Sequence, residues 1–151
     1  MIYNRTQADV DNAIKIRREK VQTFQELTED DIKTLEKGTI TTNTLNRIEA
    51  KQEELKNLLN NMGYWNTPIK NKTWDNTQIF NEEDFQRIID NTNVLRSAFF
   101  TYKDTPGTPP ISYHWRDINA LEKILYLLES AIESTKVGFT YIGNEYMLGG
   151  L

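Results

Sequence analysis

Apolar residues recur along most of this chain at steps of three and four positions, which is the period of an amphipathic helix. The clearest such segment ends before Gly63, and charged residues fill its other faces. Its stripe consists of Leu45, Ile48, Gln52, Leu55, Leu59 and Met62. An intermolecular coiled coil is one way to bury this stripe, but it spans fewer than the roughly three or four heptads expected of one. The length therefore favours packing inside a bundle.

Two helices are predicted before this segment. Thr6 followed by Asp9 has the form of a capped helix start, because the hydroxyl accepts from free backbone N–H groups and the carboxylate suits the positive helix end. The apolar stripe of this helix, which runs to about residue 25, consists of Val10, Ala13, Ile14, Val21 and Phe24. Arg17 interrupts the stripe; a buried stem with a solvated head is the commoner reason, and a functional arginine is the alternative. The second helix is short, begins after Thr28 and ends at a glycine.

Two longer helices are predicted in the second half of the chain. A loop rich in Asn, Thr and Pro covers 64–80, and a helix with a wide apolar stripe follows over 81–102. The proline-rich stretch 104–110 cannot continue that helix, because proline lacks the donor N–H and clashes with the preceding turn. The last helix covers about 115–135 and is apolar on more than one side, which indicates the spine of a bundle.

The pattern changes after residue 135. Aromatic and β-branched residues lie on both sides of Gly143 and Asn144, a dipeptide that suits a tight primed turn. We therefore expect a short C-terminal β-hairpin, or an extended tail, over 136–151. The predicted fold is all-α: residues 1–151 form a single domain, a compact bundle of about five helices that carries this tail.

Composition excludes several kinds of site and partner. The 151-residue chain has no cysteine and one histidine, which removes disulfides, thiol nucleophiles and most nitrogen-and-sulfur metal sites. A net charge of -4 argues against nucleic acid as a partner. We find neither a basic leader followed by an apolar stretch nor an apolar run of about 20 residues. The chain is expected to be made in the cytoplasm without a signal peptide and not to insert into a membrane.

Residue types that carry chemistry occur mainly at predicted helix ends. The acidic clusters 29–31 and 82–84 lie in helix first turns, where the helix dipole favours acids, so capping is preferred over general acid/base catalysis. His114 precedes the last helix, and a helix-end role is preferred over catalysis there. No glycine-rich phosphate loop or dinucleotide fingerprint is present. We therefore expect no catalytic, metal or cofactor-binding residues, and a protein that is not an enzyme.

Aromatic residues near loops and at the C-terminus are the candidates for a binding surface. Exposed aromatic rings stack on sugars or anchor protein partners, and the structural alternative is that these rings cover the end of the bundle. The candidate interaction surface consists of Trp65, Trp74, Tyr113, Trp115, Phe139, Tyr141 and Tyr146.

Four tracts together resemble a module of minor structural proteins in tailed phages and prophages of Gram-positive hosts. They are Asn4 to Val10, Leu45 to Glu49, Thr105 to Leu125, and Phe139 to Glu145, and their order and spacing cover nearly the whole chain. The resemblance implies a helical, non-enzymatic virion subunit of the phage tail, baseplate or fibre-attachment region. Such a subunit docks onto other tail proteins, and self-association is a further expectation.

The sequence also departs from this family. Relatives are usually segments of larger tail polypeptides, whereas this module starts at its own methionine, so a noncovalent partner surface is expected. His114 stands where relatives carry Ser or Thr. The first alternative is a module that binds host cell-wall glycan through Trp65, Trp74 and Trp115. A carboxylate-based wall hydrolase is the least favoured.

Overall fold

The computed structural model describes residues 1–64 and 69–149, with side chains through 138. This part of the chain contains no strand. Its five α-helices are α1 (Gln7–Ile16), α2 (Glu29–Gly38), α3 (Thr42–Asn61), α4 (Glu82–Ala98) and α5 (Trp115–Gly149), and a π-helical turn, η1 (Arg17–Val21), continues α1. The all-α prediction is confirmed.

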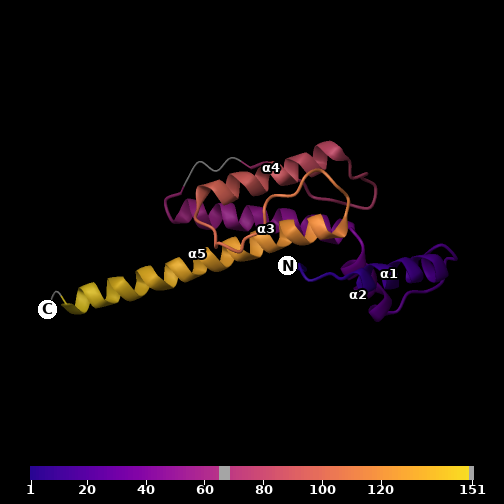
Figure 1. Cartoon of the computed structure of the whole chain (residues 1–151), viewed down its shortest axis with the longest axis horizontal. Helices are drawn as coiled ribbons and strands as arrows, with labels where there is room; N and C mark the ends of the chain where they lie inside the picture. Colours follow the sequence, from indigo (N-terminus) through magenta and orange to yellow (C-terminus); the bar gives the residue numbers. More distant parts are fainter. Residues whose placement is uncertain (65–68, 150–151) are drawn as a thin grey trace.

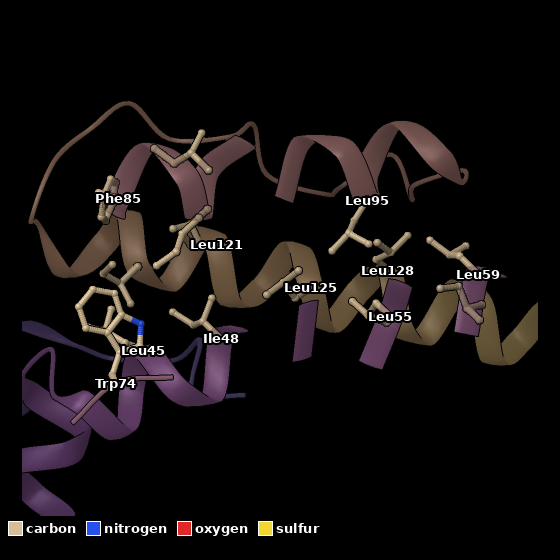
Figure 2. Packing of buried hydrophobic residues seen from close by; sticks show 14 residues of the cluster. Leu45, Ile48, Leu55, Leu59, Trp74, Phe85, Leu95, Leu121, Leu125 and Leu128 are labelled. Atoms are coloured by element: carbon tan, nitrogen blue, oxygen red, sulfur yellow. The ribbon is translucent and has the colours of Figure 1, made fainter. Parts of the chain in front are cut away.

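Helices α3, α4 and α5 pack against one another and enclose the main core (Figure 1). Figure 2 shows leucines of α5 facing leucines of α3 and α4. The buried cluster comprises Trp74 with Leu45, Ile48, Leu55 and Leu59 of α3, Phe85, Ile88, Ile89 and Leu95 of α4, and Ile118, Leu121, Leu125, Leu128 and Ile132 of α5. The stripes predicted for these three helices are therefore the ones that the bundle buries.

The predicted C-terminal hairpin is wrong, because α5 continues through Gly143 and Asn144 to Gly149. Figure 1 shows this half of α5 extending past the ends of α3 and α4. A two-stranded hairpin that packs on nothing is marginally stable, whereas a helix that has already formed gains one hydrogen bond for each residue it adds. No helix within the described residues is both long and apolar enough to span a bilayer.

Helices α1 and α2 form a separate antiparallel pair, the α1–α2 hairpin, beside the start of α5 (Figure 1). Both predicted caps are present: Thr6 with Asp9 and Thr28 with Asp31 form reciprocal capping boxes. Each capping carboxylate also pairs with a lysine near the C-terminal end of the opposite helix segment. Lys37 Nζ lies 3.0 Å from Asp9 Oδ1, and Lys20 Nζ lies 2.6 Å from Asp31 Oδ2. The two helices therefore stabilise each other's first turns.

A glycine sets how closely α1 and α2 approach. A Cβ at Gly38 would collide with the backbone carbonyl of Asp9 and the side chain of Ala13. Ala13 itself is fully buried. The closest approach of these helices is thus made by small residues, and Ile14 of α1 is left exposed.

Acid should weaken the α1–α2 hairpin through Asp31. Hydrogen bonds from Lys20 and from the backbone N–H and hydroxyl of Thr28 lower the pKa of Asp31 from 3.8 to about 2. Because the folded pKa is lower than the unfolded one, this stabilisation is complete above about pH 4 and is lost as the pH falls toward about 2. We expect Asp31→Asn to lose part of the acid dependence of the urea midpoint in this range. Asp30→Asn, whose carboxylate is 94% exposed, should keep it.

Candidate functional site

Trp74 lies in the core and does not contribute to a binding surface. Its side chain is 4% exposed, and its indole N–H donates to Glu49 Oε1 at 2.8 Å. The ring meets Phe80 edge-on, with 5.6 Å between centroids. Asn46 clamps the backbone of Trp74, since its amide accepts from the Trp74 N–H and donates to the Trp74 carbonyl. Trp74 thus holds the segment that precedes α4 against α3.

Tyr113 and Trp115 are brought together at the start of α5. Tyr113 is half exposed, and its ring packs against Phe80 and Phe85. Trp115 is partly buried, its ring stacks on His114, and its indole N–H donates to the Gln7 side chain of α1 at 3.4 Å. These rings therefore sit where the bundle meets the α1–α2 hairpin.

The other four aromatic candidates cannot be assigned to a surface. Trp65 lies outside the described residues. Phe139, Tyr141 and Tyr146 lie on the extended half of α5, but their side chains are outside the described part.

A cleft of about 280 Å³ opens between α1 and the start of α5, and we call it the α1–α5 cleft. Apolar side chains and the backbone after α2 form much of its wall, and two arginines are its charged groups. Its lining residues are Arg5, Val10, Arg17, Gly38, Thr39, Ile40, Tyr113, His114, Trp115 and Ile118. No acidic side chain is among these residues.

His114 caps α5 at one edge of this cleft. Its Nδ1 accepts from the Arg116 N–H at 3.2 Å, and its carbonyl accepts from the Asp117 N–H at 3.0 Å. The His114 N–H in turn donates to Ser112 Oγ at 3.1 Å. The helix-end role predicted for His114 is thus present, and it fixes the imidazole at the positive end of α5.

Arg5 forms the buried part of the cleft and is tied to the bundle by a carboxylate. Its Nη1 lies 2.6 Å from Glu122 Oε2 and donates to Asn119 Oδ1 at 2.9 Å. Glu122 is fully buried and also accepts from Arg47 Nε at 2.8 Å. The Nη2 atom of Arg5 is buried and has no hydrogen-bond partner in the described part of the chain.

A second buried carboxylate, Glu49, is fully occupied by structural contacts. Arg87 binds both of its oxygens, at 2.8 and 2.7 Å, and the Trp74 indole and the Lys72 backbone N–H add two further bonds. A carboxylate with all its acceptor sites filled is poorly placed to exchange protons with a substrate. The described residues contain no group of three His, Asp or Glu that could hold a metal ion.

The largest departure from the predicted burial is on the α1–α2 hairpin. The apolar stripe predicted for the first helix is buried only at Ala13, while Ile14 and Val21 are substantially exposed. Phe24, at the turn between the two helices, is 97% exposed and has a positive φ of 55°. Apart from the glycines, no other described residue has a positive φ. The hairpin therefore presents apolar side chains to solvent.

Glu49 and Glu122, the two most deeply buried carboxylates of the described residues, were not predicted from the sequence, although each leaves a signal there. Glu122 follows Leu121 and is four positions after Ile118, so it lies on the buried side of an apolar stripe. Glu49 follows Ile48 and is four positions after Leu45. A charge at such a position requires a buried partner, because an unpaired charge in the core is very costly.

The comparisons with known proteins add no relative: no family model, no curated protein and no solved structure matches the chain.

Proposed function

We propose that this chain is a non-enzymatic structural subunit of a phage tail, baseplate or fibre-attachment region, and that it docks onto other tail proteins through Phe24. The exposed phenylalanine at the turn of the α1–α2 hairpin carries the docking part of this proposal. The resemblance of the four sequence tracts to tail modules supports the phage context. The occupied state of Glu49 and Glu122 supports a binding role over a catalytic one.

Phe24 lowers the stability of the isolated chain in two ways, through its backbone conformation and through the exposure of its ring. A non-glycine residue in the left-handed region costs on the order of 1–3 kcal/mol, and a fully exposed aromatic ring forgoes the gain from burial. Residues held in such conformations cluster at functional sites, and buried aromatic anchors dominate protein interfaces. Burial of the ring in a partner's pocket would recover the lost hydrophobic free energy.

The surroundings of Phe24 suit a protein partner. Three other exposed apolar residues, Ile14, Val21 and Ile32, lie on the same hairpin. Charged residues such as Arg18 and Glu19 separate them along the chain. An apolar anchor with a polar rim is the usual anatomy of an interface.

Phe24→Gly should separate docking from folding. Glycine adopts a positive φ without strain, so the variant should be as stable as the wild type or more stable. We expect its incorporation into tailed particles, measured by mass spectrometry of particles from the strain that encodes the chain, to fall at least about tenfold, since anchor residues contribute about 2 kcal/mol or more. Ile79→Ala is the control, because Ile79 is 85% exposed and is not part of the hairpin.

The outcomes distinguish the alternatives. Normal incorporation of the Phe24→Gly chain would contradict docking through this residue, and absence of the wild-type chain from particles would contradict the tail assignment. Wild-type chain that is absent from particles but binds purified host-wall polysaccharide would favour the glycan-binding alternative.

A further inference from the structure

We propose that the α1–α5 cleft binds a compact oxyanion, a carboxylate or a phosphate, carried on a small ring. The inference rests on the charge of the lining residues, on a buried donor without a partner, and on the shape of the cleft. It is independent of docking through Phe24, which lies at the turn of the α1–α2 hairpin and does not line this cleft.

The lining side chains carry positive charge that is only partly neutralised. Glu122 lies behind Arg5 and offsets its charge. Arg17 forms no ion pair with any described residue, and no acidic residue lines the cleft to offset it. Arg17 is also the first residue of the π-helical turn η1, and such turns are rare and recur at functional sites. The cleft therefore offers a guanidinium with no internal counter-ion.

Arg5, which lines the cleft, carries a buried donor without a partner in the described part of the chain. The Arg5 side chain is 2% exposed, and its Nη1 is committed to Glu122 and Asn119, while its Nη2 has no partner. Buried N–H groups in native proteins are nearly always satisfied, so an orphan in the wall of a cleft indicates a missing acceptor. An oxyanion offers several acceptor sites and suits the planar fork of a guanidinium.

The N-terminal end of α5 also favours an anion in the cleft. This helix spans 35 residues, and its first turn borders the cleft at Trp115 and Ile118. The positive end of a helix dipole stabilises anions within about one turn. His114 and Asp117 already offset part of this positive end, so the two arginines supply most of the attraction.

The other lining residues of the cleft are suited to pack against the ring of a small cyclic ligand. Val10, Ile40 and Ile118 are apolar, and Trp115 and Tyr113 present aromatic surfaces. The volume of about 280 Å³ is close to the lower limit of small-molecule sites, roughly 300 Å³. A ring with one oxyanion would place its charge toward the arginines and its body against the apolar walls.

Calorimetric titration of the full chain with four probes tests the proposal: glucose 6-phosphate, glucuronate, inorganic phosphate and uncharged glucose. We expect at least one of the ring-borne oxyanions to bind with a Kd of about 1 mM or tighter, and glucose not to bind. The stronger of the two identifies the anion as phosphate or carboxylate. Inorganic phosphate should bind more weakly, and equal binding of it would overturn the ring part of the proposal.

Matched arginine variants locate the site. Arg17→Gln should weaken binding by about tenfold or more, because it removes a charge-assisted contact. Arg18→Gln removes the same charge from the neighbouring position, which does not line the cleft, and should bind like the wild type. Both residues are exposed, so both variants should fold. Absence of binding by both ring-borne oxyanions, or equal weakening by the two substitutions, would overturn the proposal.

Discussion

Leu125→Ala should lower the free energy of unfolding by about 2–5 kcal/mol, enough to leave a domain of ordinary stability only marginally folded. Leu125 is fully buried in the first half of α5, where it belongs to the core shared with α3 and α4 (Figure 2). Its truncation removes transfer free energy and leaves a cavity that three packed helices cannot easily close. Urea unfolding followed by helical circular dichroism measures the loss.

Leu127→Ala is the matched control for this prediction. The substitution removes the same atoms two residues further along α5, at a position that is partly exposed and outside the buried cluster. We expect it to cost clearly less than Leu125→Ala, because solvent fills the space that the side chain leaves. An equal loss at both positions would mean that α5 does not pack as described.

The sequence predicts those parts of the fold that depend on local pattern. The apolar stripes of α3, α4 and α5 repeat at the helical period, and a stripe must be buried somewhere. The cap formed by Thr28 and Asp31 needs only residues three positions apart, so it too is readable from the chain. The role of His114 at the start of α5 follows from its place before an apolar period.

Contacts between distant segments leave no such pattern. Arg5 and Glu122 are 117 positions apart, and Glu49 and Arg87 are 38 apart, so each pair meets only after the helices have packed. The α1–α5 cleft has the same origin, because its residues come from the N-terminal segment, the α1–α2 hairpin and α5. Charges on a stripe indicate that a partner exists but do not identify it.

In the first helix the apolar period predicts the helix itself but not which of its apolar side chains are buried. The sequence predicts an amphipathic helix in a compact bundle of about five helices, and α1 packs mainly on α2 through Ala13 and Gly38. Periodicity identifies a helix and its apolar face, but the choice of partner depends on close approach, which here favours small residues. Phe24 lies beyond that close contact and stays in solvent.

Glu122→Ala should also be strongly destabilising, by about 3–5 kcal/mol, because it leaves the buried Arg5 guanidinium without its counter-charge. Arg47 loses its carboxylate partner in the same step, and so does the Ile2 backbone N–H, which donates to Glu122 Oε1 at 3.3 Å. The N-terminal segment, which leads into α1, would then be held to α5 mainly by the hydrogen bonds between Arg5 and Asn119. Urea unfolding and limited proteolysis near residue 5 measure the two effects.

Glu133→Ala provides the control, because Glu133 lies on the same helix as Glu122 at an exposed position and forms no ion pair with any described residue. This substitution should cost about 1 kcal/mol or less. If the loss of stability comes from the unpaired charge of Arg5, removing that charge as well should restore part of the stability. Replacing both buried partners, as in Arg5→Met with Glu122→Leu, removes the unpaired charge, and such replacements are often neutral or stabilising relative to the original pair. The double variant should therefore be more stable than Glu122→Ala. A double variant no more stable than the single one would mean that the loss comes from packing around Glu122 rather than from an unpaired Arg5.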